Sequence, residues 1–339
     1  MKKILSYIAK YLLPLVLGLG IFWLLYRQFD MKEILSILQM DMSVFWIVVS
    51  LLIGILSYLF RALRWQLQLK SLDITPSFGC LCNAVFGMYA FNLVLPRFGE
   101  LWRCTYVAGH EKKSFSLVFG SAMSDRFADT LTVALLTVGV FCSQMGVMRR
   151  FLAEYPQAQE RISAILTSPW IYAAIVAVVV AIVFLFARKS ENRWINGIKD
   201  ALHKMWDGFR SVVSMKEGKL MFVLYTVLIW GGYLMQLYVC FRAFDWMSGL
   251  SFSQALVLFV LGSISMVIPV QGGIGPWHAA IIFGLMFYGI GREQAGAFAL
   301  VAHGSQMIVT ILLGIYTTIA IMVERRRNKT IEAGDCSTE

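Results

Sequence analysis

The sequence predicts an all-α polytopic membrane protein, with about six full transmembrane helices and two re-entrant helical hairpins in an inverted-topology repeat. Three observations support this fold class. Apolar side chains make up 58% of the 339 residues and charged ones only 15%, whereas soluble domains carry about a quarter charged residues. Long apolar runs alternate with basic segments. Two further apolar stretches are interrupted by proline and glycine.

Six apolar runs have the length of bilayer-crossing helices, which take ~17–25 residues, or could reach it with their flanking residues. They cover residues 12–26, 44–60, 115–143, 170–187, 220–241 and 296–323. The first run follows a basic N-terminus and could be a signal peptide. Because no small-residue cleavage site follows Tyr26, we expect a retained first helix instead.

The formal net charge of +10 is distributed unevenly along the chain. Most Lys and Arg fall in segments that the topology places inside: the N-terminus, the residues from Arg61 and Arg64 to Lys70, the 188–219 segment and the residues after 323. This is the positive-inside pattern of a plasma (inner) membrane protein with both termini cytoplasmic. The basicity therefore gives no reason to expect a nucleic-acid partner.

Two pairs of shorter apolar segments surround the breaks Pro96-Arg-Phe-Gly-Glu100 and Pro269-Val-Gln-Gly-Gly-Ile-Gly-Pro276. The segment 277–289 would cover only ~20 Å as a helix, which is too short to span the bilayer. Non-helical backbone is tolerated at membrane depth only where protein or a wet cavity surrounds it. We therefore predict re-entrant hairpins, with a surface loop between full spans as the alternative.

The two halves of the chain share one order of segments. Span, short helix, break, short helix and long span describe residues 44–143 and again 220–323. Because the first spans of the two halves run in opposite directions, the pattern predicts an inverted repeat. The membrane domain covers 1–323, its 188–219 linker is an amphipathic cytoplasmic helix or a solvated connector, and 324–339 is a disordered basic tail.

Ionisable residues lie within the 115–143 run, where Asp125 is ~15 Å from the cytoplasmic end. Asp125, Arg126 and Asp129 are candidates for a functional site, because buried charges in a span need partners. The expected partners are Arg97, Glu100 and Arg103 of the first hairpin. Two interpretations are open: a locked ion-pair network, or a working site in which arginine forks suit a phosphate.

The second half carries less charge. His278 follows the second break and His303 lies early in the last helix. Each could be a hydrogen-bonded core residue, while titration near neutral pH leaves a proton relay open. Gly272, Gly273 and Gly275 permit close approach of backbone to a ligand.

Together these motifs resemble the family of the lysylphosphatidylglycerol synthase transmembrane region, which is flippase-like. The resemblance rests on Asn92-x-x-x-Pro96-Arg97-x-Gly99-Glu100-x-x-Arg103, on Asp125-Arg126-x-x-Asp129 and on Pro269-x-x-Gly272-Gly273-Ile-Gly275. It implies a membrane domain that moves a lipid between leaflets, here without the aminoacylating domain of bifunctional members. Asp125, Gln271 and His278 depart from the usual family pattern, and the last two imply a different headgroup or coupling ion, so the family's lipid cannot be carried over to this chain.

The first hypothesis is thus a lipid translocase for an anionic or polar headgroup. Its headgroup-binding candidates are Arg97, Glu100, Arg103, Arg126, Gly272, Gly273, Gly275 and His278. Its proton-coupling or ion-pair candidates are Glu100, Asp125, Asp129 and His303. The second hypothesis is a scaffold or regulator of a lipid- or envelope-synthesis enzyme, and a homodimer is open in either case. An enzyme is the third, although the sequence holds no catalytic motif, metal-ligand spacing or cofactor motif that would support one.

Overall fold

The structure is a computed structural model that describes residues 13–40, 42–143 and 218–335, together with isolated positions between 146 and 206. Within these residues it contains ten α-helices and two short 3₁₀ turns. Extended backbone pairs there only at a single bridge between Met42 and Phe244. The predicted all-α class is confirmed.

Four helices of the described chain are long and apolar enough to span a bilayer. They are α4 (Val44–Lys70), α7 (Phe115–Ser143), α12 (Lys219–Phe241) and α15 (Arg292–Asp335). The 27 residues of α4 cover ~40 Å, more than the ~30 Å of the hydrocarbon core. Large apolar side chains such as Leu135 and Ile315 are exposed along these helices, as expected of a surface that contacts lipid tails.

The other two expected spans have different outcomes. The 12–26 run forms α2 (Leu13–Tyr26), whose 14 described residues cover ~21 Å and are followed by α3 (Met31–Met40). The 170–187 run has only isolated described positions, and the 188–219 linker lies almost wholly outside the described residues. The structure therefore supports four full spans, and the count of six stays a prediction.

The first break separates two antiparallel helices, α5 (Phe78–Val94) and α6 (Phe98–His110). Leu95 is extended, as the residue before a proline favours, and Arg97 takes a left-handed φ of 62°. A Cβ on Gly99 would lie 2.0 Å from the carbonyl oxygen of Met88. Glycine at this position therefore allows the two helices of the hairpin to touch.

The second break is longer. It lies between α13 (Phe252–Ser265) and α14 (Pro276–Phe287) and contains the 3₁₀ turn η3 (Gln271–Gly273). Pro276 occupies the first turn of α14, where its missing N–H costs nothing. Gly275 has a φ of 91°, and a Cβ there would lie 2.7 Å from the carbonyl oxygen of Gly18 in α2. Helix α2 thus packs directly on the second break.

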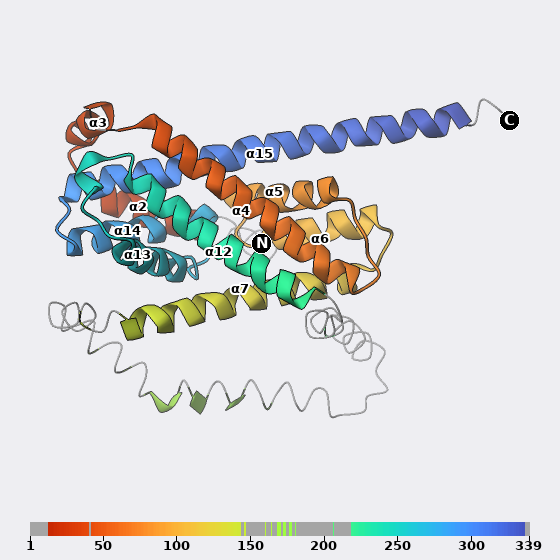
Figure 1. The fold of residues 1–339 in the computed structure, drawn as a ribbon, viewed down its shortest axis with the longest axis horizontal. Coiled ribbons are helices and arrows are strands. Elements are labelled where there is room, and N and C mark those ends of the chain that lie inside the picture. Colours follow the sequence, from red (N-terminus) through yellow and green to blue (C-terminus); the bar gives the residue numbers. More distant parts are fainter. Residues whose placement is uncertain are drawn as a thin grey trace, which may run out of the picture.

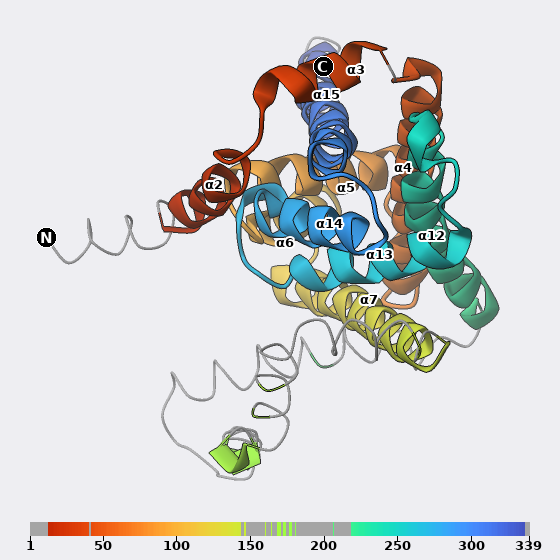
Figure 2. The ribbon, with the colours of Figure 1, turned by 90° about the vertical axis from the view of Figure 1, so that its left-hand side faces the viewer.

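The two hairpins lie at opposite ends of the long helices (Figure 1). Helices α4 and α12 pack along each other, α5 packs on α15, and α13 packs on α7. The view along the bundle shows α13 and α14 in front of α5 and α6 (Figure 2). The two breaks contact each other through exposed residues, where the Arg97 Nη2 donates to the carbonyl oxygen of Val267 at 3.0 Å.

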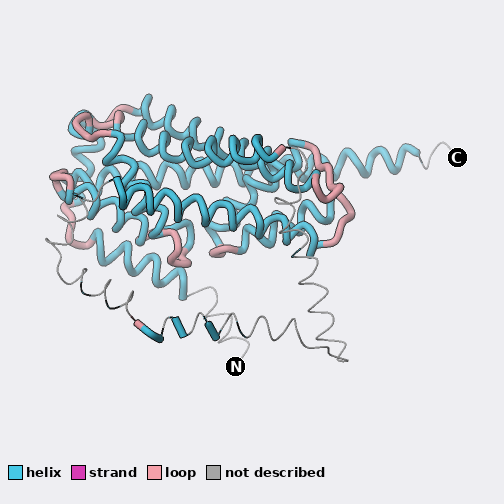
Figure 3. The backbone as a smooth tube through the Cα atoms, turned by 60° about the horizontal axis from the view of Figure 1, so that its bottom comes forward, coloured by secondary structure: helices cyan, strands magenta, loops and turns pink. Residues whose placement is uncertain are grey.

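Each half of the chain has its own hydrophobic core. The cluster of the first half includes Trp65, Leu81 and Val118 from α4, α5 and α7. The cluster of the second half includes Leu258 and Phe298 from α13 and α15, with residues of α2 and α3. Loops lie mainly at the ends of the bundle, with short loop segments near its middle (Figure 3).

Helix α15 continues to Asp335, whereas the sequence predicts a disordered tail from residue 324. The segment 324–333 contains neither proline nor glycine, so nothing in it stops a helix. The first glycine after this segment is Gly334.

Candidate functional site

Two arginines of α4 clamp two aspartates of α7 in the protein interior. The Arg61 Nη1 lies 2.6 Å from Asp129 Oδ2 and 3.4 Å from Asp125 Oδ2. The Arg64 Nη2 lies 2.7 Å from an oxygen of each aspartate. Spacings of i,i+3 and i,i+4 place each pair on one face of its helix. Arg61 is 2% exposed, and Arg64 and Asp125 are fully buried.

The first hairpin closes this cluster into a ring. The Arg103 Nε lies 2.7 Å from Glu100 Oε2, and its Nη2 lies 3.3 Å from Asp125 Oδ2. The Arg126 Nε lies 2.6 Å from Glu100 Oε1, and its Nη1 lies 3.2 Å from Asp129 Oδ2. Each carboxylate therefore contacts at least two guanidinium groups. We call the seven residues Arg61, Arg64, Glu100, Arg103, Asp125, Arg126 and Asp129 the ion network.

The ion network holds four cations and three anions, so its formal charge is +1. Charges removed from water must be paired, and deleting one partner of a buried pair costs about 3–5 kcal/mol. Two buried donors, the Arg61 Nε and the Arg103 Nη1, have no hydrogen-bond acceptor. Nowhere in the described residues do three or more His, Cys, Asp or Glu gather in a way that could hold a metal ion.

The sequence predicts that Glu100 and Arg103 meet Asp125 and Asp129, and the structure brings them together. The expectation for Arg97 is wrong, because its guanidinium binds the carbonyl oxygen of Val267 at the second break rather than a carboxylate. Being exposed, it can point away from the cluster.

Arg61 and Arg64 were missed by the sequence analysis, which counted them among the cytoplasmic charges. The structure corrects that count, because α4 continues to Lys70 and buries both side chains. The sequence signal is weak: the two arginines lie three residues apart and so share one face of a helix, but the spacing does not show that this face is buried.

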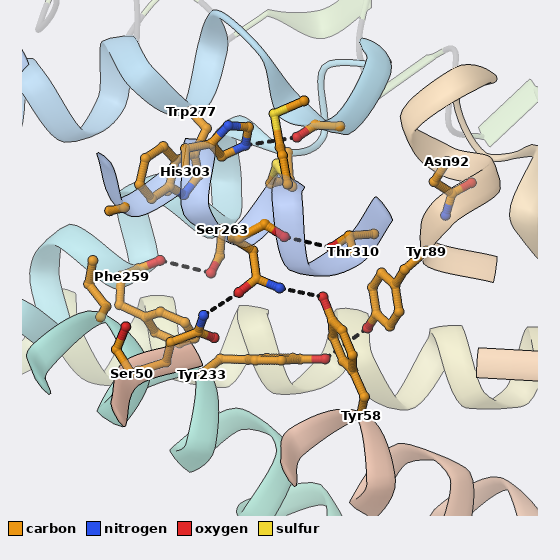
Figure 4. Close-up of a pocket in the computed structure, with 18 of the residues that line it drawn as sticks. Ser50, Tyr58, Tyr89, Asn92, Tyr233, Phe259, Ser263, Trp277, His303 and Thr310 are labelled. Carbon is orange, nitrogen blue, oxygen red and sulfur yellow. Dashed lines mark hydrogen bonds between the residues drawn. The ribbon is translucent and has the colours of Figure 1, made fainter. Parts of the chain in front are cut away.

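A cavity of about 490 Å³ opens beside the ion network, within the 300–1,000 Å³ of typical ligand pockets. Arg61, Arg126 and Asp129 line one part, and Gly272 and His303 another. Its aromatic lining consists of Tyr58, Tyr89, Trp230, Tyr233, Phe259 and Trp277. Its neutral polar lining includes Ser50, Asn92, Gln236, Ser263, Gln306 and Thr310. Both halves of the chain contribute (Figure 4).

Hydrogen bonds connect the two halves across the cavity. The Gln306 amide donates to the Tyr58 hydroxyl at 2.7 Å and accepts from the amide of Gln236. The hydroxyls of Tyr89 and Tyr233 share a hydrogen bond of 2.8 Å. These contacts orient the amide and phenol groups of the wall.

The second break places two histidines side by side, with ring centroids 4.6 Å apart. The His303 Nε2 donates to the carbonyl oxygen of Gly272 at 2.9 Å. His278 packs against Phe22 and Tyr26 of α2. The Nδ1 atoms of both histidines are buried without a hydrogen-bond partner.

The sequence-predicted residues thus divide by position. Arg126, Asp129, Gly272 and His303 line the cavity. Glu100, Arg103 and Asp125 hold the ion network. Gly273, Gly275 and His278 shape the second break.

These features define a multi-pass helical membrane protein with a cavity, lined in part by charged and polar side chains, between two helical hairpins. The chain belongs to the family of the lysylphosphatidylglycerol synthase TM region, whose sequence model matches residues 11–314. It is also similar to the UPF0104 membrane protein PH1989 of Pyrococcus horikoshii, with 23% identity over 275 residues, 76% of this chain and 81% of that relative. No solved structure matches the chain. The family resemblance predicted from the sequence is confirmed.

Proposed function

We propose that this protein moves a lipid with a polar or anionic headgroup between the leaflets of the inner membrane, through the cavity between the two hairpins. The observation that carries the proposal is a cavity of about 490 Å³ with charged and polar side chains in its lining, surrounded by helices whose outer faces are apolar. Irregular backbone and ionised groups at membrane depth are tolerated where they line such a cavity. The lipid tails would stay in the bilayer while the headgroup crosses, without covalent chemistry.

In this proposal the hairpins are re-entrant and enter from opposite leaflets. Their positions at opposite ends of the long helices (Figure 1) and the contact between their breaks support it. The repeats are 44–143 and 220–323 within a domain of 1–323, with both termini cytoplasmic. Broken helices that meet at the midplane are how many transporters present polar groups to a substrate.

The residues of the site take different roles. We assign headgroup contact to Arg126, which lines the cavity. Asp125 and Asp129 each contact three arginines. Proton uptake by either would therefore disrupt several ion pairs. His303, with His278 beside it, is the better candidate for proton coupling.

The test is reconstitution in liposomes with fluorescent lipid analogues, where a membrane-impermeant quencher reports the fraction of label in each leaflet. Ser263 and Ser265 form a matched pair, because both hydroxyls donate to a carbonyl of α13 and Ser263 lines the cavity. We expect Ser263→Leu to slow lipid movement and Ser265→Leu to leave it at the wild-type rate. Wild-type protein that moves every tested lipid no faster than empty liposomes would contradict the proposal.

The second candidate function is a scaffold or regulator of a lipid-synthesis enzyme. It is favoured by the ion network, in which every carboxylate is paired as in a structural staple. It predicts transport at the rate of empty liposomes and a lipid-synthesis enzyme, or a second copy of the chain, that co-purifies. It also predicts that Glu100→Gln lowers the amount of folded protein rather than a transport rate.

A further inference from the structure

The charges that line the cavity are unsuited to a cationic headgroup. Asp129 is the one acidic residue among the described lining residues, and it is already bound by Arg61, Arg64 and Arg126. It also accepts from the Trp230 indole at 3.2 Å. Like charges 4 Å apart repel by about 4 kcal/mol at an effective dielectric constant of 20. An ammonium group would meet a network of formal charge +1 without an unpaired carboxylate.

The neutral part of the lining combines aromatic faces with groups that both donate and accept hydrogen bonds. The rings of Trp230 and Tyr233 stand at 86° with centroids 6.2 Å apart and form a corner. Gln236 and Gln306 line the same cavity, and an amide offers both donors and an acceptor. A cyclic polyol has C–H faces that pack on aromatic rings and a rim of hydroxyls that both donate and accept. The lining is therefore complementary to a sugar or inositol ring.

The cavity also has donors for a phosphate, and Arg126 is near the corner because Asp129 contacts both Arg126 and Trp230. The Arg126 Nη2 donates to the Met88 thioether at 3.4 Å, which is a weak acceptor. The Asn92 side-chain oxygen accepts from the Gly99 N–H at 2.9 Å, which leaves its NH₂ group to donate elsewhere. Both residues line the cavity, and arginine is well suited to binding phosphate.

We propose that the cavity binds a lipid whose phosphate carries a cyclic polyol, with the ring in the corner of Trp230 and Tyr233 and the phosphate at Arg126. The hydroxyls would bond to Gln306, Gln236 and Asn92. The inference rests on the proposed function, because it names the headgroup that the translocase would carry. The proposed substrate therefore differs from the cationic lysyl headgroup that the name of the family suggests.

Binding can be measured from the quenching of tryptophan fluorescence, since two tryptophans line the cavity. The purified protein in nanodiscs would be titrated with short-chain phosphatidylinositol, phosphatidylglycerol and phosphatidylethanolamine of equal chain length, and with glucose 1-phosphate as a ligand without tails. We expect phosphatidylinositol to bind about ten-fold more tightly than phosphatidylethanolamine. We expect Gln306→Leu to weaken phosphatidylinositol about ten-fold while changing phosphatidylethanolamine little.

The matched control is Gln66→Leu, whose amide donates to the carbonyl oxygen of Pro76 and whose phosphatidylinositol affinity should equal that of the wild type. Equal affinity for the three lipids would overturn the inference, as would glucose 1-phosphate binding as tightly as the lipid. The two proposals fail separately. Selective binding without lipid movement in liposomes would contradict the proposed translocase and support the proposed binding site. Movement of all lipids without selective binding would support the translocase and contradict the binding site.

Discussion

The two halves of this chain have the same order of helices and different chemistry at their centre. The half from α4 to α7 carries all seven members of the ion network and buries five of them. Among the described residues, the half from α12 to α15 brings neutral groups to the cavity instead, including Gln236, Gln306 and His303. Similar backbone architecture therefore does not impose similar polar chemistry. We infer that the first half fixes the architecture while the second half adapts to a ligand.

The contacts between the two helices of each hairpin also differ. Gly99 of the first hairpin is pressed against backbone, the carbonyl of Met88. Gly284 of the second hairpin is pressed against the end of the Leu258 side chain, which can rotate away. At these two positions the first hairpin therefore has a backbone contact that cannot yield, and the second has a side-chain contact that can.

The largest expected effect comes from breaking the ion network. Asp125→Asn should lower the free energy of unfolding by about 3–5 kcal/mol, because it leaves Arg64 and Arg103 buried without their full charge partners. Thermal unfolding of the purified variant in detergent measures the loss. Asp245→Asn is the control, since Asp245 is exposed, and it should be near neutral. If the two variants unfolded at the same temperature, the ion network would contribute nothing measurable to stability.

A smaller effect should come from closing the space between the helices of a hairpin. Gly99→Ala should cost about 1–3 kcal/mol, because its Cβ would overlap the Met88 carbonyl oxygen. Gly284→Ala should cost less, since Leu258 can move. Gly79→Ala has open space within 4 Å and should be neutral or stabilising. The order of the three melting temperatures checks this account, and equal loss at Gly99 and Gly284 would remove the contrast between the hairpins.

The second half should tolerate loss of a polar side chain. His278→Phe should lower the stability by less than about 1.5 kcal/mol, because the swap roughly conserves volume. His278 already packs against Phe22 and Tyr26. The measurement is the melting temperature of the purified variant, compared with that of Asp125→Asn under the same conditions. A loss of stability as large as that of Asp125→Asn would show that polar side chains stabilise both halves to the same extent.

The smallest effect concerns a contact between the halves at the surface. His110 of α6 contacts the adjacent Glu111, and it also contacts Glu324 of α15. Partial burial lowers its pKa, but the two carboxylates outweigh burial and raise the pKa above the ordinary 6.5. The stabilisation is thus complete below pH 6.5 and is lost as the pH rises through the raised pKa. It should stay below about 1 kcal/mol, since the pair is exposed.

Melting temperatures of wild type and His110→Gln across neutral pH would measure this contribution. The wild type should lose its small advantage over the variant as the pH rises. Parallel curves would show that the contact contributes nothing.

The sequence predicted the hairpins and most of the charged cluster because both leave local signals. A proline and glycines inside apolar runs mark a break, and Asp125 and Asp129 in a span demand partners. Glu100 and Arg103 were found because they lie beside a break. In each case the chemistry is unusual for its position.

The rest depends on contacts between distant segments. Arg61 and Arg64 lie beside Lys70 at the end of a span, where positive-inside charges are expected, so only the packing of α4 on α7 shows that they are buried. The aromatic and amide wall was not predicted either. Tyrosine and glutamine in helices carry no sign of a shared cavity, and Tyr233 and Gln306 meet only through the tertiary fold.

The central claim is that both breaks lie in the interior of the bilayer. Val94 and Ile268 flank the breaks and are exposed, so single cysteines there can carry spin labels once Cys142 and Cys336 are replaced by serine. The depth of each label follows from its collisions with oxygen and with a water-soluble nickel chelate in liposomes. The account predicts hydrocarbon depth for both labels, and either label at the headgroups or in water would contradict it.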